Sequence, residues 1–191
     1  QLLREGLAFH QQGQISDAAA RYLEVLARQA HQPDALHLLG VTKIQTGDNT
    51  GAITDLRRAV ALRPIAAEYR HHLGCALLAA EQLADAVEAF EHALVVAPDH
   101  GEAIHNLGQA LRQAGQFAEA ARYLLRAVAI RPEVTDWRIE LAACLRETDR
   151  SSNALKVLAD ILASGSVSIE LCFEFALAHR ALDQVRAAEP W

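Results

Sequence analysis

Small residues return every 34 positions along this chain, and this period constrains the fold more than any other feature. Glycine or alanine stands at Gly6, Gly40, Gly74, Gly108, Ala142 and Ala176. Twelve residues after each of them comes an alanine, at Ala18, Ala52, Ala86, Ala120, Ala154 and Ala188. Such a regular repeat predicts a chain built by stacking copies of one supersecondary unit.

The sequence predicts two helices in each unit. Apolar residues within a unit are spaced by three and four positions, which is the spacing of a helix face. The break between the helices falls at Gly13, Gly47 and Gly115, where glycine adopts the left-handed backbone conformation that ends a helix, and at Glu81 and Asp149 in the other units. The second helix is expected to stop before Pro64, Pro98 and Pro132. Alternating β-branched runs are missing, so we predict an all-α fold.

The repeated columns predict how the helices pack. The small residue of the first helix is expected to face the alanine of the second, so that the two backbones approach closely. We predict a single solenoid over residues 1–191 with units at about 1–32, 33–66, 67–100, 101–134, 135–168 and a partial sixth at 169–191. In the sixth unit, an apolar helix from Ile169 to Leu182 is expected to precede a short partner helix from Asp183 to Ala188.

The pattern resembles the tetratricopeptide repeat (TPR) family. The third unit carries the family signature as Leu73-Gly74, Leu77, Ala86, Phe90 and Pro98, and the fourth as Ile104, Leu107-Gly108, Leu111, Ala120, Leu124 and Pro132. Arg70 and Arg138 depart from it, because they replace the large apolar residue that opens the signature. The resemblance implies a right-handed superhelical solenoid of antiparallel helix pairs, with about five full repeats and a partial sixth. It also implies that the first helices line a concave groove that binds an extended peptide or a partner helix.

Residues of the first helices that the packing columns leave over are the candidate binding site. They lie three positions before, one after and four after the small residue. The first half of this row combines histidines with aliphatic side chains, and the second half carries arginines. The predicted site comprises His37, Val41, Ile44, His71, Cys75, Leu78, His105, Gln109, Arg112, Ile139, Arg146, Phe173, Leu177 and Arg180.

Each part of this row has a structural alternative. The histidines would hydrogen-bond a peptide backbone and respond to pH, or they would be polar filling of a solvated face. The arginines would bind carboxylates in bidentate pairs, or they would only be solvated. Cys75 would be a thiol activated by His71, or a small apolar residue. An acidic column at Asp34, Glu68, Glu102, Asp136 and Glu170 is predicted to stabilise the first turn of each first helix.

Composition and motifs disfavour several functions. The chain carries 18 Lys and Arg against 24 Asp and Glu, a formal net charge of −6 without a basic stripe, which disfavours nucleic acid and anionic membranes. No apolar run approaches the roughly 18 to 20 residues of a membrane span. Three widely spaced cysteines indicate neither a disulfide framework nor a zinc site, and we expect a reducing, cytoplasmic location. No catalytic or nucleotide-binding motif is present, so we predict no catalysis within the chain, no cofactor and no metal.

Two functions stay open. The segment from Pro33 to Gly40 and the later Asn106-Leu107-Gly108 are similar to repeats of bacterial O-linked protein glycosyltransferases, which implies a docking part of a larger enzyme. The alternative is a freestanding scaffold. Lysine and asparagine are missing from groove positions where family members clamp the acidic C-terminus of heat-shock chaperones, so that partner is disfavoured. The chain begins at Gln1 without Met, so we expect a piece of a longer protein, with self-association through Ile169 to Leu182 as a further possibility.

Overall fold

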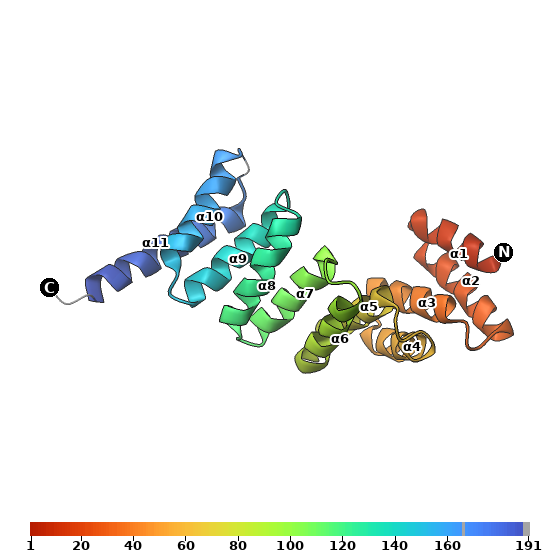
Figure 1. The fold of residues 1–191 in the computed structure, drawn as a ribbon. Coiled ribbons are helices and arrows are strands. Elements are labelled where there is room, and N and C mark those ends of the chain that lie inside the picture. The colour runs from red at the N-terminus through yellow and green to blue at the C-terminus, as the bar shows by residue number, and fades with distance from the viewer. Residues whose placement is uncertain (166, 189–191) are drawn as a thin grey trace. The chain divides into compact units, whose positions relative to one another are not determined.

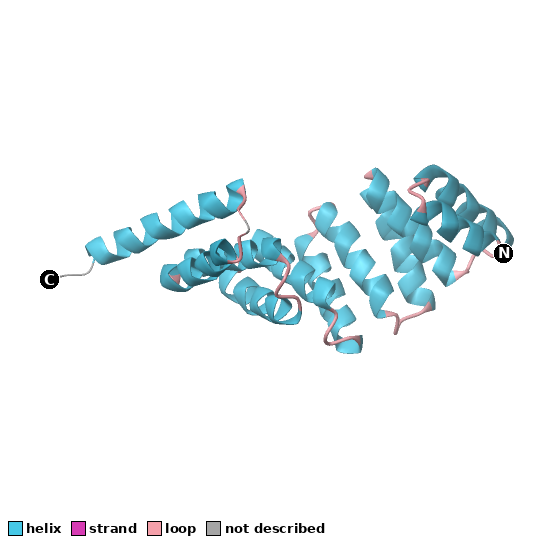
Figure 2. Cartoon of the chain, turned by 90° about the horizontal axis from the view of Figure 1, so that it is seen from above, coloured by secondary structure: helices cyan, strands magenta, loops and turns pink. Residues whose placement is uncertain are grey.

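A computed structural model of the protein describes residues 1–165 and 167–188, with the side chains of the last helix described as far as Gln184. All regular secondary structure in these residues is helical (Figure 2), which confirms the predicted all-α fold. The chain divides into two compact units, residues 1–98 and the residues from Asp99 onward. Each unit is described by itself below.

Unit 1 contains three antiparallel helix pairs, which follow one another along the chain (Figure 1). Within each pair the two helices pack together, and each second helix also packs on the first helix of the next pair. Unit 1 is built from α1 (Leu2–Gln11), α2 (Ile15–Arg28), α3 (Pro33–Thr46), α4 (Asn49–Leu62), α5 (Ala67–Ala79) and α6 (Leu83–Val96).

Unit 2 continues the same pattern with two pairs and a last helix. This last helix, α11, packs against both helices of the preceding pair. Unit 2 is built from α7 (Gly101–Gln113), α8 (Phe117–Ile130), α9 (Thr135–Glu147), α10 (Ser151–Ala163) and α11 (Ile169–Ala188).

The turns inside the pairs lie where the sequence predicts them. Gly13, Gly47 and Gly115 have φ angles of 75°, 82° and 76°, and Glu81 and Asp149 both have φ of 57°. The left-handed conformation is costly for residues with a Cβ atom, by about 1–2 kcal/mol. Glu81 and Asp149 therefore bear a cost that glycine avoids, because the antiparallel packing of the pair requires this turn.

The nearest neighbour of the small residue is the large side chain that follows the predicted alanine by four positions, and at Gly108 the backbone oxygen of the predicted Ala120 lies within 3.5 Å of an added Cβ atom as well. An added Cβ atom at Gly40 would lie 2.6 Å from Cγ of Leu56, and one at Gly74 would lie 2.5 Å from Cε1 of Phe90. These large side chains stand four residues after the expected alanine. Glycine is needed because a leucine or an aromatic ring lies directly on its backbone, and the alanine fills the space beside that contact.

The predicted break in the sixth unit is wrong. Instead of ending at Leu182, α11 runs without interruption from Ile169 to Ala188. The sequence Ala181-Leu182-Asp183-Gln184 contains no glycine or proline, and alanine, leucine and glutamine are strong helix formers. Neither a left-handed turn nor a steric stop separates two helices here.

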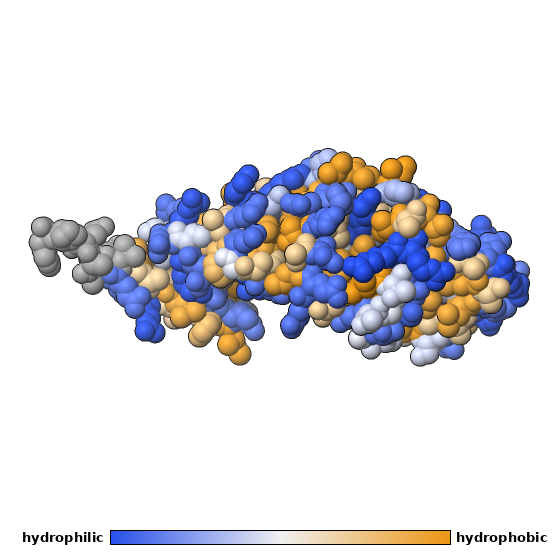
Figure 3. Space-filling view, turned by 90° about the horizontal axis from the view of Figure 1, so that it is seen from below, coloured by the Kyte–Doolittle hydropathy of each residue, from blue (hydrophilic) through white to orange (hydrophobic). Residues whose placement is uncertain are grey.

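The exposed surface mixes apolar and hydrophilic side chains. On the face in view in Figure 3, orange and blue side chains alternate over short distances rather than forming an apolar belt. Large exposed apolar residues include Leu23, Ile65, Val95 and Ile169. None of the helices in the described residues combines the length and the apolar character needed to cross a membrane.

Candidate binding site on the first helices

Unit 1 places six of the predicted site residues on two adjacent helices. His37, Val41 and Ile44 belong to α3, whereas His71, Cys75 and Leu78 belong to α5, and α3 packs against α5. His37 and His71 are buried, with 9% and 8% of their surface exposed. The other four residues are half-buried.

His37 is part of the contact between α3 and α5. Its ring stacks on Tyr69 with centroids 4.4 Å apart, and its Nε2 lies 2.9 Å from Nδ1 of His72. Asp34, Glu68 and His71 also act on it electrostatically. Burial, reinforced by the neighbouring His72, lowers the pKa of His37 from 6.5 to about 4. His37 is therefore neutral at pH 7.

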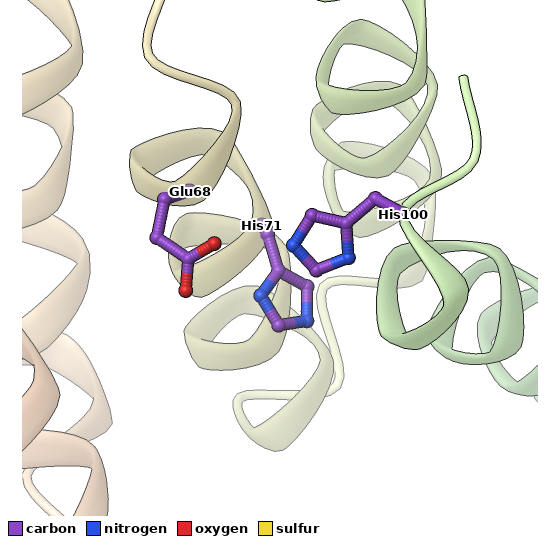
Figure 4. A group of neighbouring side chains, drawn as sticks. All are labelled: Glu68, His71 and His100. Atoms are coloured by element: carbon purple, nitrogen blue, oxygen red, sulfur yellow. The ribbon is translucent and has the colours of Figure 1, made fainter. Parts of the chain in front are cut away.

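His71 and Cys75 lie side by side, one turn apart on α5. The Sγ of Cys75 is 3.5 Å from Nε2 of His71, which matches the proximity predicted from the sequence. Figure 4 shows Glu68 and His71 projecting from neighbouring positions of the same helix. The ring of His71 also lies 6.0 Å from Phe90, so this histidine contributes to the contact between α5 and α6.

Unit 2 begins with a histidine cap. His100, also drawn in Figure 4, is the N-cap residue of α7, and its Nδ1 accepts a hydrogen bond from the backbone N–H of Ala103 at 3.2 Å. The same nitrogen lies 3.6 Å from Oε2 of Glu102 in the first turn. The cap satisfies one of the donors that the start of a helix leaves unpaired.

His105 repeats the environment of His37 with one change of chemistry. Its ring stacks on Trp137 with centroids 4.6 Å apart, and its Nε2 lies 3.1 Å from Oε2 of Glu140. Gln109 donates to the other oxygen of Glu140 at 2.9 Å. Burial works to raise the pKa of Glu140, but hydrogen bonds from His105 and Gln109 and the charge of Arg112 bring it below its ordinary value.

The three arginines of the predicted site differ in their ion pairs and exposure. Arg146 is held by Glu147 at 2.6 Å and by Glu174 at 3.3 Å. Arg180 is exposed on α11. Arg112 forms no ion pair within the described residues, and its buried Nε has no hydrogen-bond partner there. Of the three, Arg112 combines a buried donor with the lack of a direct ion pair in the described residues, although Glu140 acts on it electrostatically.

The three apolar residues predicted for unit 2 have different environments. Ile139 is 8% exposed and belongs to the core cluster that joins α9, α10 and α11. Leu177 is half-buried on α11. Phe173 is 62% exposed. Of these apolar residues, Phe173 offers the largest exposed surface, whereas Ile139 holds the unit together.

Sequence reasoning missed a second period of 68 residues, twice the first. It relates Tyr69 to Trp137, and these aromatic residues are the platforms on which the buried histidines stack. It also relates Arg63, whose guanidinium lies 5.7 Å from the Tyr69 ring, to Arg131, which lies 4.9 Å from the Trp137 ring. The 68-residue spacing between the tyrosine and the tryptophan, and between the two arginines, is the sequence signal that identifies these aromatic and arginine residues.

This second period explains the two departures from the family signature. Tyr69 and Trp137 stand one position before Arg70 and Arg138, and they are 5% and 7% exposed. The opening aromatic residue is therefore present but shifted by one position. The shift turns the ring toward the first helix of the preceding pair, where it covers a histidine.

The acidic column has two uses. All five of its members lie in the first turn of a first helix, as predicted. Asp34 also binds Arg63 at 2.8 Å and accepts a hydrogen bond from the Tyr69 hydroxyl, and Glu102 pairs with Arg131. Burial would raise the pKa of Asp34, but the hydrogen bonds from Tyr69 and Arg63 lower it. Asp34 therefore joins two successive pairs through Tyr69, and Glu102 holds Arg131 at the end of the second helix of its own pair.

Known proteins match this chain at the level of the repeat. Family models described as tetratricopeptide repeat match residues 3–67, 38–102, 71–134 and 111–168. The TPR repeat-containing protein PA4299 of Pseudomonas aeruginosa is 38% identical over 65 residues, which are 34% of this chain and 26% of that protein. The match therefore spans about a quarter of that relative's length.

Solved structures match the fold. A crystal structure of MamA has a TM-score of 0.72 at 19% identity and covers 95% of this chain and 96% of its own. MamA from Desulfovibrio magneticus RS-1 has a TM-score of 0.79 at 20% identity, over 85% and 92% of the two chains. TTC0263, a thermophilic TPR protein of Thermus thermophilus, has a TM-score of 0.68 at 22% identity, over 93% and 96%.

The family assignment follows from the agreement of these observations. The family models match most of the chain, and the described residues form helix pairs with the turns and the glycine contacts that the repeat requires. The chain therefore belongs to the tetratricopeptide repeat family, and its fold is a solenoid of antiparallel helix pairs.

Proposed function

We propose that this chain binds an extended segment of a partner protein along the first-helix faces of its repeats. The family and the fold support a protein–protein interaction module, because stacked repeats present long surfaces to a ligand. The proposed contact residues are the fourteen side chains predicted from the repeat register. They include the half-buried Val41 and Ile44 in unit 1, and Gln109, Arg112, Phe173 and Arg180 in unit 2.

The observation that carries this proposal is the state of Arg112. Its buried Nε has no hydrogen-bond partner in the described residues, and a buried donor without an acceptor costs about 1–3 kcal/mol. Glu140 acts on Arg112 electrostatically but is already hydrogen-bonded by His105 and Gln109. Arg112 as a whole is half-buried and forms no ion pair within the described residues, so its guanidinium is the group that a carboxylate of a partner would bind.

We further propose that the chain is the partner-docking part of a larger bacterial protein, such as a protein glycosyltransferase, acting in the cytoplasm. The support is the similarity of the segment from Pro33 to Gly40 to the repeats of those enzymes. A freestanding scaffold is the alternative. Sequencing the gene beyond the codon for Trp191 separates the two, because an attached catalytic domain would continue as alternating strands and helices.

The test of the binding site compares two triple variants. In the first, Arg112, Arg146 and Arg180 are changed to Gln, which removes the charge but keeps a polar side chain. In the matched control, three arginines of second helices, Arg28, Arg57 and Arg126, are changed to Gln. Proteins captured by the wild-type chain from a bacterial lysate are identified, purified and titrated against all three chains.

Loss of at least tenfold in affinity for the first variant alone would support the site, since one unmade charged contact is worth about 1.5–3 kcal/mol. Circular dichroism of each variant checks that the helices are retained. Equal affinity of the first variant and the wild type would show that the partner binds elsewhere on the chain.

A further inference from the structure

Unit 2 contains a groove that uses none of the fourteen candidate residues. It is formed by α8, α9 and α10 and has a volume of about 330 Å³. Its walls are largely aliphatic, with Leu125, Leu141, Leu145 and Val157 among the lining residues. Leu125 is 60% exposed, so the groove presents accessible apolar surface beside its aliphatic walls.

The charged residues that line this groove all have the same sign. Arg122, Arg150 and Lys156 contribute to the lining, and no aspartate or glutamate does. All three cations are exposed, and none forms an ion pair within the residues that the structure describes. The chain as a whole carries a net charge of −6, so the charge of this patch is opposite in sign to the net charge of the chain.

Unit 1 contains the corresponding groove 68 residues earlier, formed by α4, α5 and α6, with a volume of about 210 Å³. Leu73 and Leu77 of that groove correspond to Leu141 and Leu145. The two grooves therefore share sequence positions, and they differ in other side chains that line them.

The side chains make the unit 1 groove self-contained. Arg57 stands where unit 2 has Leu125, and its guanidinium binds Asp85 at 3.0 Å. Asp85 stands where unit 2 has Asn153, and Glu88 replaces Lys156. In unit 1 the charges are balanced within the groove, whereas in unit 2 the cations lack anionic partners beside an apolar surface.

We propose that the groove between α8, α9 and α10 is a docking site for an acidic, amphipathic segment of a partner protein. Apolar side chains of the segment contact Leu125, Leu145 and Val157, and its carboxylates pair with the cations at the groove. Complementary charge both steers the encounter and sets the orientation of such a segment. The volume accommodates a few side chains, so the site fits a short anchor rather than a folded domain.

Binding at this groove depends on salt. The three cations are exposed, so their attraction for carboxylates is screened as the Debye length shrinks from about 10 Å at 0.1 M salt to about 3 Å at 1 M. The apolar contacts persist at high salt. We therefore expect the affinity for an acidic segment to fall, without vanishing, as sodium chloride is added.

The test uses a panel of fluorescein-labelled synthetic peptides, each about 14 residues long, with leucines at helical spacing and glutamates between them. Matched peptides have every Glu replaced by Gln or have the same composition in scrambled order. Fluorescence anisotropy measures their affinity for the full chain. We expect the acidic amphipathic peptides to bind and the Gln peptides to bind about tenfold more weakly.

Three variants locate the site. Leu125→Arg with Asn153→Asp grafts the ion pair of unit 1 into unit 2 and should weaken binding at least tenfold. Arg57→Gln with Asp85→Asn is the matched control in unit 1 and should leave binding unchanged. Arg112→Gln, which tests the first-helix face, should also leave it unchanged, so failure of one proposal is distinguishable from failure of the other.

Several results would overturn the docking site. Absence of binding by every acidic peptide would do so, as would equal binding by the grafted variant with its circular dichroism unchanged. Binding of dodecanoate without the peptides would identify an amphiphile as the occupant instead. Concentration-dependent dimerisation that the graft abolishes, seen by sedimentation, would identify a second copy of the chain.

Discussion

Acidification is expected to destabilise the contact between α3 and α5 through His37. This side chain is 9% exposed, stacks on Tyr69 and has its Nε2 2.9 Å from a ring nitrogen of His72. A proton on His37 adds a charge to a buried site whose nearest hydrogen-bonding partner is another imidazole. The fold therefore favours the neutral form, which is why the pKa of His37 is lowered to about 4.

The size of the effect follows from the two pKa values. In the unfolded chain His37 has its ordinary pKa of 6.5, so between pH 6.5 and 4 the unfolded state binds more protons than the folded state. The stability that neutral His37 contributes is fully present above pH 6.5 and is lost as the pH falls toward 4. The loss is about 2 kcal/mol between pH 7 and pH 5, and about 3 kcal/mol over the whole window.

The assay compares wild type with His37→Gln, which keeps a polar side chain but cannot titrate. Urea unfolding followed by far-UV circular dichroism at pH 7 and pH 5 gives the change in unfolding free energy for each. His31→Gln is the control, because His31 is an exposed residue in the turn between α2 and α3. The carboxylates Asp34 and Glu140, whose pKa values are lowered, lose their stabilising contribution only below about pH 4.3 and do not interfere.

The wild type should lose about 2 kcal/mol more than His37→Gln on going from pH 7 to pH 5, and His31→Gln should behave as the wild type. The imidazole Hε1 resonance of His37 should titrate with a midpoint near 4. A midpoint near 6.5, or equal pH dependence of wild type and His37→Gln, would refute the argument that burial keeps this histidine neutral.

Four further predictions concern packing, a turn and thiols. Gly74→Ala should lower the free energy of unfolding by about 1–3 kcal/mol in denaturant titrations, because its Cβ atom would lie 2.5 Å from Phe90. Glu81→Gly should raise the free energy of unfolding by about 1 kcal/mol, because glycine adopts the left-handed turn without the cost of a Cβ atom. Trp137→Ala should cost about 3–5 kcal/mol, with equal unfolding midpoints for variant and wild type as the contrary result. With a thiol reagent, exposed Cys172 should react first and Cys144 only on unfolding, because burial raises the pKa of Cys144 to about 11. Labelling of Cys144 in the folded chain would contradict this prediction.

Prediction of the fold succeeded where the signals are local. The turn at Gly47 and the helix end before Pro64 follow from backbone preferences that act within a few residues, whereas the turn at Glu81 follows from the repeat register and opposes the local preference. The predicted turn in the sixth unit was wrong, because local helix preferences continue through that position. Repeat arithmetic places a turn after Leu182, but no residue there interrupts a helix, so α11 continues.

Prediction of the candidate site was less complete, because partners are chosen in three dimensions. The register correctly placed His37 and His71 on adjacent first helices. It did not reveal that Tyr69 covers His37, because that contact joins residues in successive repeats, 32 positions apart. The same limit hid the hydrogen bond between His105 and Glu140.

The 34-residue period by itself determined the class of fold, the helix pairs and their turns, because each of these depends on spacing along the chain. The tertiary structure decided which polar side chains are satisfied and which are left over. Arg57 and Arg122 are both arginines of second helices, yet one is neutralised across its groove by Asp85 and the other has no such carboxylate. That difference arises because electrostatic pairing acts through space between neighbouring helices, at distances that a linear sequence does not record.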